Sequence, residues 1–562
     1  MVLPVNDITS VLTRREGSLK DHDAKTCRGY PESRPDVTTE HTDICDSARR
    51  LENSPIRHGA DWLPCAAAAA AALLVYACTL RGTYIYDDVA VVRDDPRVLN
   101  PGLWSQLWTR PYFVESVDKL YRPLVSMSFA LDHWLHGSRP VWFHLVNIAL
   151  HMAVAAAVAA LGIRLGGRRV GWIAGILFAV HPVHVEAVAG LVGRSESACA
   201  LATIVGLWLF LKPGTMTLRR IVGIWVCFVA AILSKEQGLL FPALLLAAAP
   251  LRRPPVMSRG MRLWFIVAMS WTLAAYLMAR EQVAPMEWDR SMLSPYVNPL
   301  VLSRGWDRVL MPLVLLGRYA GLLVFPLRLS IDYGGAIIGS RASWHDPFLY
   351  LGMIAVLAWV VAAIVAWRTR DWPLLFCLVA MAIAYSMVAN IFTLIGTNFA
   401  ERLMYLPSAF FLPAVGLILR RFRWQAVAPM VGILAVLGAA RAFCYARHWN
   451  DRLGFYQFCA ESGPRSERAY ALLWGEYKTR GDWSNARRVA EQARRMVPDR
   501  VEAYVMCIEC ELEDNRFDAA DGDVQDGAAH IDRSDILILL KWRDTIARQR
   551  AAADKGANAG VK

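Results

Sequence analysis

The chain has 562 residues, of which 55% are hydrophobic, and a formal net charge of +12. A soluble globular protein is roughly 45–50% apolar, and here the excess lies in blocks of about 18–22 residues, long enough for a helix to cross a bilayer. The composition therefore excludes a soluble protein. The arginine clusters lie between these blocks, so the charge fits cytoplasmic loops of a polytopic membrane protein better than a nucleic-acid-binding surface.

Residues 1–58 are polar and lack a hydrophobic period, so they are predicted to form a disordered N-terminal tail. The apolar run 62–80 is interpreted as the first, uncleaved membrane helix. Further apolar blocks follow at 142–162, 170–181, 197–211, 221–234, 238–250, 262–280, 308–326, 348–366, 373–392, 402–419 and 425–441. With the tail in the cytoplasm, three basic loops at 164–169, 212–220 and 251–262 all lie on the inner side.

The block 308–326 decides the number of spans. If it crosses the membrane, the basic segments 368–371 and 420–423 lie outside, against the positive-inside rule. Its Arg318, Pro312 and Pro326 also suit a helix in the interface. We therefore predict an all-α membrane domain over 59–445 with about eleven spans. Its external loop 89–140, rich in tryptophan and tyrosine, is expected to hold interfacial helices.

The character of the chain changes from residue 464. Large and small apolar residues recur there in the helix–turn–helix register of a tetratricopeptide repeat, with a second copy 34 residues on. Residues 464–550 are therefore predicted to form a short, degenerate tetratricopeptide-like helical domain, on the outer side of the membrane under this topology.

Two adjacent carboxylates, Asp87 and Asp88, directly follow the first predicted span. They repel each other, and a desolvated site would raise at least one pKa. Such a carboxylate can act as a general base toward a hydroxyl. The alternatives are a solvated loop end and a helix cap.

Two cationic positions on the outer side are candidates for binding phosphate. Arg122 follows Tyr121 in the aromatic external loop, where its planar guanidinium suits a phosphate or a lipid headgroup. Lys235 and Glu236 interrupt two short apolar stretches, where charge is costly unless it is paired or faces a cavity. Lys235 is therefore either a phosphate ligand or one half of a structural ion pair with Glu236.

Two further polar segments lie at the same predicted edge. The segment 181–194 brings together His181, His184, Glu186 and Arg194, which are expected to hydrogen-bond a polar ligand or to satisfy one another. Their spacing is not that of a zinc site, and no metal ion is predicted. Glu401 and Arg402 begin another apolar helix, where Arg402 could bind phosphate and Glu401 could cap the helix.

Taken in order, these motifs resemble those of the transmembrane-and-tetratricopeptide-repeat O-mannosyltransferases. The resemblance covers roughly residues 60–445, with the repeats behind it. It is carried by residues 86–88, 121–124, 144–147, 181–194, 235–238, 312–333 and 400–408.

The resemblance implies a GT-C glycosyltransferase fold and an enzyme that moves mannose or another hexose with inversion. The donor would be a polyprenyl-phosphate sugar, and the acceptor a hydroxyl of a protein or glycan on the non-cytoplasmic face. Asp87 or Asp88 would be the base, and no metal or other cofactor is implied. The other candidate residues would bind the donor: Tyr121, Arg122, His181, His184, Glu186, Arg194, Lys235, Glu236, Glu401 and Arg402.

The short repeat array and the absence of N-glycosylation sequons suit a bacterial relative, in the inner membrane with a periplasmic site. An endoplasmic reticulum enzyme with a lumenal site is the alternative. Two other functional classes remain open. A lipid or sugar transporter, or flippase, would also carry membrane-edge charges, and a membrane assembly protein would use the repeats to recruit a partner. Lipids are expected partners in every case.

Overall fold

The computed structural model describes residues 61–113, 119–252, 258–285, 298–330, 332–333, 338–531 and 535–559. The predicted tail 1–58 lies outside these ranges. Within them the chain forms helices, turns and loops, and no β-strand. The chain is therefore an all-α protein, as the sequence predicts.

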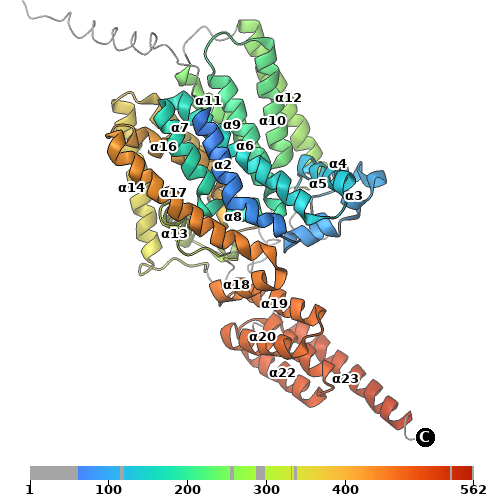
Figure 1. Cartoon of the computed structure of the whole chain (residues 1–562). Coiled ribbons are helices and arrows are strands. Elements are labelled where there is room, and N and C mark those ends of the chain that lie inside the picture. Colours follow the sequence, from blue (N-terminus) through green and yellow to red (C-terminus); the bar gives the residue numbers. More distant parts are fainter. Residues whose placement is uncertain are drawn as a thin grey trace, which may run out of the picture. The chain divides into compact units, whose positions relative to one another are not determined.

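The membrane part of the chain is a bundle of helices (Figure 1). Proline in the first turn marks the start of several of them, and two of these are also capped by Asp346 and Asp371, whose side chains accept backbone N–H groups. The helices are α2 (Leu63–Tyr76), α5 (Pro123–His136), α6 (Pro140–Gly166), α7 (Arg168–Val180), α9 (Arg194–Leu211), α10 (Leu218–Ser234), α11 (Phe241–Ala248), α12 (Arg259–Val283), α13 (Asp307–Val324), α14 (Pro347–Arg368), α15 (Trp372–Ser386), α16 (Tyr405–Leu419) and α17 (Trp424–Ala446).

Seven helical stretches in the described ranges are long and apolar enough to cross a bilayer. The helices Arg168–Val180 and Pro182–Ala189 meet at a bend of 52°. If they form one broken span, the number of candidate spans in the described ranges is eight. The other predicted crossings are α10, α11 and α15, with 17, 8 and 15 residues. The chain is an integral multi-pass membrane protein, and the count of eleven spans stays a prediction. The seven stretches are Leu63–Arg81, Pro140–Gly166, Leu191–Leu211, Arg259–Val283, Pro347–Arg368, Glu401–Leu419 and Trp424–Asn450.

Small residues allow the central helices to approach one another closely. α6 contacts α2, α7, α9 and α16, and α2 lies beside α6 and α7 in Figure 1. A Cβ atom on Gly175 would lie 2.6 Å from that of Ala159 and 3.1 Å from that of Ala68. Such small-residue contacts let membrane helices pack tightly without a hydrophobic driving force between them.

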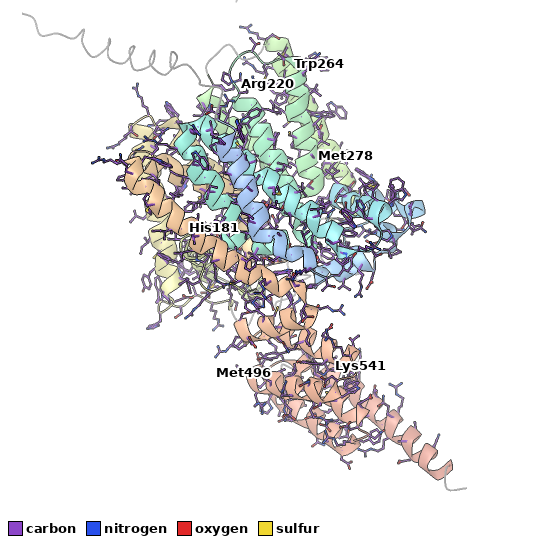
Figure 2. All side chains as sticks on the ribbon, in the orientation of Figure 1. His181, Arg220, Trp264, Met278, Met496 and Lys541 are labelled. Atoms are coloured by element: carbon purple, nitrogen blue, oxygen red, sulfur yellow. The ribbon has the colours of Figure 1, made fainter. Side chains whose placement is uncertain are left out.

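The outer helices present apolar side chains to their surroundings. Trp264 and Met278, labelled in Figure 2, project from α12 and are 75% and 66% exposed. Large exposed apolar residues on a soluble surface would favour aggregation, whereas on a membrane helix they face lipid. The exposed apolar face of α12 therefore agrees with burial in a bilayer.

The disputed helix α13 packs along α14. A Cβ on Gly317 would lie 1.9 Å from the carbonyl oxygen of Phe348, so only glycine permits this approach. α13 also carries Asp307, Arg308 and Arg318, and it is not among the seven candidate spans. Whether it crosses the membrane stays a prediction.

The external loop is built from short helices around a small core of its own. They are η2 (Val89–Arg93), α3 (Pro96–Leu99), η3 (Pro101–Leu103) and α4 (Gln106–Thr109), followed by α5, whereas η1 (Ala77–Arg81) ends the first candidate span. Buried residues of this core include Val91, Val98, Tyr112 and Phe129. Because the loop has a packed core, it can hold the segment that follows the first span in a defined position.

The C-terminal part consists of α18 (Arg452–Ser462), α19 (Glu467–Thr479), α20 (Trp483–Met496), α21 (Val501–Glu513), α22 (Phe517–His530) and α23 (Ile536–Ala559). The pairs α19–α20 and α21–α22 repeat one hydrogen bond at the offset expected of tetratricopeptide repeats. The hydroxyl of Tyr470 donates to the Pro464 carbonyl, and that of Tyr504 donates to the Pro498 carbonyl, both at 3.0 Å.

Candidate active site

The turn after the first span places the two aspartates. Tyr86, directly before them, has a φ of 58°, in the left-handed region that non-glycine residues rarely adopt. Its backbone N–H donates to the hydroxyl of Tyr456 (3.4 Å), and its ring lies beneath the guanidinium of Arg468. Such a conformation costs about 1–3 kcal/mol and persists only where surrounding contacts hold it. It is the kind of backbone found at functional sites.

Asp88 is buried and held by backbone groups. Its side-chain oxygens accept the N–H of Val192 (2.9 Å) and of Ile85 (3.4 Å), and the residue is 1% exposed. Burial raises the pKa of Asp88 to about 7, although these backbone hydrogen bonds oppose the rise. Asp88 therefore joins the turn to the segment 191–193, and this contact favours a structural role.

Asp87 is in a different position. It is partly exposed, and no donor among the described residues hydrogen-bonds its carboxylate. Burial raises its pKa, and the positive charges of Arg402, Arg468 and Arg122 oppose the rise. A carboxylate without a fixed partner, surrounded by cations, can accept a proton from a substrate.

The raised pKa of Asp88 should make the protein less stable as pH rises from about 4 to about 7. An unfolded aspartate has a pKa near ~3.9, whereas that of Asp88 in the folded state is about 7. Between these values the folded state holds a proton that the unfolded state has lost, so rising pH favours unfolding, and above pH 7 the contribution is gone.

Thermal unfolding in detergent over this pH interval tests the prediction. The decrease in Tm with rising pH should be smaller in Asp88→Asn than in the unchanged protein. Burial also raises the pKa values of Glu467 and Asp523, so the difference between the two proteins isolates Asp88. Equal slopes would contradict the assignment of the proton to Asp88.

Three of the predicted cations are already paired with carboxylates. Arg122 donates through Nε and Nη2 to both oxygens of Glu236, at 2.8–3.2 Å. Arg402 donates through its backbone N–H (2.9 Å) and through Nη1 to Glu186. Lys235, 5% exposed, pairs with Glu196 and not with the adjacent Glu236. The structural ion pair considered for Lys235 thus exists, but with another carboxylate.

Arg194 lies in a fully occupied buried site. Its guanidinium pairs with Asp132 (2.6 Å) and donates to the side chains of Ser128 (3.0 Å) and Asn147 (2.9 Å) and to the Phe143 carbonyl (3.0 Å). The residue is 1% exposed. This environment leaves no surface for a phosphate and favours a structural role.

The two predicted histidines lie between helices. Nε2 of His181, labelled in Figure 2, contacts the Leu323 carbonyl (3.1 Å), and Nδ1 accepts the Val183 N–H (3.2 Å). The nitrogens of His184 contact the Phe178 carbonyl and the Ser408 hydroxyl, both at 2.8 Å. All four nitrogens thus have protein partners, which favours the alternative of internal satisfaction.

Glu401 and Tyr121 also contact the protein rather than open space. An oxygen of Glu401 accepts the Ser330 N–H (2.9 Å) and the Tyr333 hydroxyl (2.7 Å), which ties the segment around 330 to η10 (Glu401–Met404), the turn directly before α16. The Tyr121 hydroxyl donates to the Trp108 carbonyl (3.2 Å). In the described ranges, no group of three or more His, Cys, Asp and Glu residues is arranged to hold a metal ion.

Sequence reasoning missed three charged residues here. Glu196 lies two positions beyond the segment 181–194 and directly before the apolar block 197–211, so its carboxylate at a predicted membrane edge was a visible signal. Asp132 lies in α5 with nothing nearby to mark it. Arg468 lies in the predicted repeats, where a charge is usually a solvated side chain, and no local signal connects it to Tyr86.

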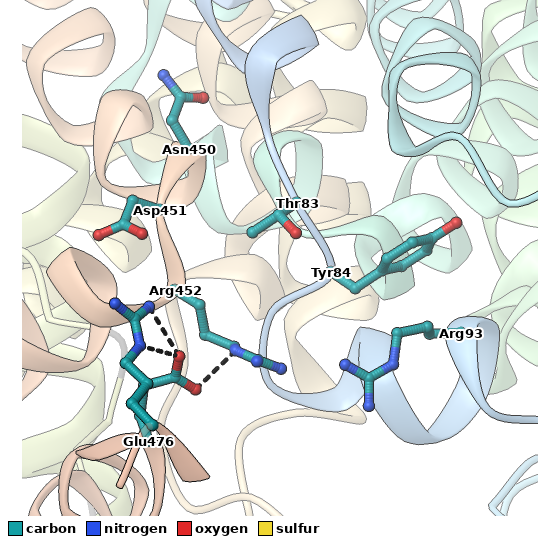
Figure 3. A pocket seen from close by; sticks show the side chains of 8 residues that line it. Thr83, Tyr84, Arg93, Asn450, Asp451, Arg452 and Glu476 are labelled. Carbon is teal, nitrogen blue, oxygen red and sulfur yellow. Dashed lines mark hydrogen bonds and ion pairs between the residues drawn. The ribbon is translucent and has the colours of Figure 1, made fainter. Parts of the chain in front are cut away.

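A polar cavity of about 290 Å³ lies where the external loop meets α18 and α19 (Figure 3). Glu476, 6% exposed, accepts from Arg452 (2.8 Å) and Arg480 (2.9 Å). Arg93 and Tyr84 line the opposite wall. The Arg452–Glu476 ion pair joins the linker α18 to the first repeat helix, whereas Arg480 pairs with Glu476 at the end of α19 itself.

Comparison with curated proteins finds relatives that are named as protein O-mannosyl-transferases. The chain is 26% identical to the protein O-mannosyl-transferase F38B6.6 of Caenorhabditis elegans over 68% of this chain and 55% of the relative. It is 25% identical to Drosophila melanogaster Tmtc3 over 81% of this chain and 57% of the relative. It is 37% identical to mouse TMTC1 over 26% of this chain and 16% of the relative. No family model and no solved structure matches.

The chain thus spans about half or less of the length of these relatives. The resemblance noted from the motifs is confirmed by these three relatives, each of which is named as a protein O-mannosyl-transferase.

Proposed function

The chain is homologous to the transmembrane-and-tetratricopeptide-repeat O-mannosyltransferases, and from this relationship we propose that it is a membrane glycosyltransferase. It moves a hexose, mannose in the first instance, from a polyprenyl-phosphate donor to a hydroxyl of a protein or glycan on the non-cytoplasmic face. The observation that supports this best is Asp87, a carboxylate without a hydrogen-bond partner in the described part of the chain, near three arginines at the end of the first span.

In the proposed reaction, Asp87 accepts the proton of the acceptor hydroxyl as its oxygen attacks the anomeric carbon of the sugar. The bond from that carbon to the phosphate oxygen breaks on the opposite face, so the configuration inverts. The electron pair leaves with the polyprenyl phosphate. Neutralising this charge provides the larger part of the rate gain, and the base contributes roughly 10²–10⁴-fold. No metal ion or other cofactor takes part.

Arg402 is the best placed of the originally predicted cations to neutralise the phosphate. Its side chain is 28% exposed, and Glu186 engages only its Nη1 and its backbone N–H within the described residues. Its Nε and Nη2 groups have no hydrogen-bond partner among the residues that the structure describes, so we propose that they donate to phosphate oxygens. Arg122, by contrast, donates its Nε and Nη2 groups to Glu236. We therefore propose that it shapes the site and contributes to its positive electrostatic potential without binding the phosphate directly.

The location proposed for the enzyme is the bacterial inner membrane with the site facing the periplasm. The endoplasmic reticulum membrane with a lumenal site is the alternative. In both, the donor's prenyl chain lies in the bilayer and its phosphate at the membrane edge, near the turn 84–88.

Turnover on a donor panel tests the function. Purified full-length protein is incubated with polyprenyl phosphates carrying mannose, glucose, galactose or N-acetylglucosamine and with a serine- and threonine-rich peptide library. Release of polyprenyl phosphate and labelling of peptide are measured. We expect both with the mannosyl donor and neither with Asp87→Asn. No release from any donor would refute the proposed reaction.

A further inference from the structure

The first repeat helix, α19, approaches the turn that carries Asp87. The Tyr456 hydroxyl of α18 accepts the N–H of Tyr86 (3.4 Å). Ser466, which caps α19, donates its hydroxyl to Asp332, and Ser330 contacts Ser462 (3.4 Å). The start of the repeat segment is therefore attached to two separate parts of the membrane domain, beside the candidate base.

This attachment brings Arg468 to the site. Its guanidinium carbon lies 4.8 Å from the centre of the Tyr86 ring, and Tyr86 is the residue directly before Asp87. A guanidinium stacked on an aromatic face keeps the N–H groups of its edges available. α19 itself is joined to α18 by the Arg452–Glu476 ion pair (Figure 3) and by the hydrogen bond that Gln457 donates to the Tyr477 hydroxyl (2.9 Å).

Arg468 differs from the other cations of this region because it forms no ion pair with a carboxylate of the described residues, although the negative charges of Asp87 and Asp332 lie near enough to raise its pKa. Arg122, Arg402, Lys235 and Arg194 each pair with a carboxylate. Among the described residues no carboxylate pairs with Arg468, and the neighbouring Asp332 accepts from Ser466 instead. An unpaired guanidinium beside a candidate base is suited to an anion that arrives and departs, and its planar fork matches phosphate.

We infer that Arg468 binds the phosphate of the lipid-linked donor, so that the repeat segment completes the active site rather than only recognising the acceptor. This inference rests on the proposed function for its choice of anion. The observations that support it are the guanidinium over Tyr86, the absence of an ion pair to that guanidinium among the described residues, and the contacts that hold α18 and α19 to the membrane domain.

Binding of a short prenyl phosphate tests the inference without any need for turnover. Farnesyl phosphate and farnesol are titrated into the full-length protein in detergent, and the Kd of each is measured. The variants are Arg468→Gln and Arg468→Lys. Arg465→Gln is the matched control, because Arg465 is an exposed arginine three residues earlier with no hydrogen bond or ion pair in the described part of the chain.

Arg468→Gln should weaken farnesyl phosphate binding about 10–100-fold, since hydrogen bonds to a charged group are lost. Arg468→Lys should recover part of it, and farnesol binding should be the same in all proteins. The inference is overturned if Arg468→Gln binds farnesyl phosphate like Arg465→Gln, or if farnesol binding falls equally. It is also overturned if only the KM of acidic peptide acceptors rises.

The two proposals can fail separately. If no sugar donor is turned over but farnesyl phosphate binding still depends on Arg468, the proposed reaction is wrong and the anion site stands. If transfer occurs and Arg468→Gln behaves like Arg465→Gln in both assays, the reaction stands and the role of Arg468 is wrong.

Discussion

Replacing Asp87 with asparagine should lower the rate of sugar transfer by about 10²–10⁴-fold, the usual contribution of a general base. The amide cannot accept the proton of the acceptor hydroxyl, yet its shape is nearly that of the carboxylate. Because Asp87 makes no hydrogen bond to the described residues, the variant should fold and insert normally. The measurement is the initial rate of polyprenyl phosphate release at saturating donor, together with the Tm.

Asp88→Asn is the matched control for this experiment. An asparagine offers one acceptor oxygen where Asp88 offers two to the N–H groups of Val192 and Ile85. Leaving a buried donor unsatisfied costs about 1–3 kcal/mol, so this variant should lose thermal stability. Full activity in Asp87→Asn, or normal stability with lost activity in Asp88→Asn, would reverse the two assignments.

Replacing Arg194 with methionine should destabilise the protein by about 3–5 kcal/mol, because it leaves the partly buried Asp132 without its counter-charge. The Asn147 side chain and the Phe143 carbonyl lose their donor at the same time. The expected result is a lower yield of folded protein and a lower Tm in detergent, with the remaining folded fraction still binding farnesyl phosphate.

The double variant Arg194→Met with Asp132→Leu should recover part of the lost stability, since it removes both charges together. The matched control is Arg110→Met, because Arg110 is exposed. Its change in Tm shows what the loss of one positive charge alone does to stability. If Arg194→Met is as stable as the unchanged protein and binds farnesyl phosphate more weakly, Arg194 is a phosphate ligand and the structural role is wrong.

The class of the protein and its resemblance to the O-mannosyltransferase relatives could be predicted from local sequence. Apolar runs long enough for a bilayer indicate a membrane protein without knowledge of packing, because backbone groups in lipid must be satisfied within one helix. The segments that contain the site residues could also be found, since polar residues at a membrane edge are conspicuous among apolar blocks. The adjacent pair Asp87 and Asp88 is the clearest case.

The partners of those residues could not be predicted. Lys235 and Glu236 are neighbours in sequence, yet Lys235 pairs with Glu196 and Glu236 pairs with Arg122. Arg122 and Glu236 are 114 residues apart. Such pairs depend on which helix faces pack together, and the apolar patterns of these helices, buried on several sides, carry little information about that.

The sequence alone thus determined that this chain crosses the membrane many times, and which segments bring polar groups to its edge, because hydropathy and motif order are local properties. Only the tertiary structure separated Asp87 from Asp88 and brought Arg468 of the repeats to Tyr86. The roles of charged side chains depend on burial, hydrogen-bond partners and neighbouring charges, and these arise when distant segments pack against one another.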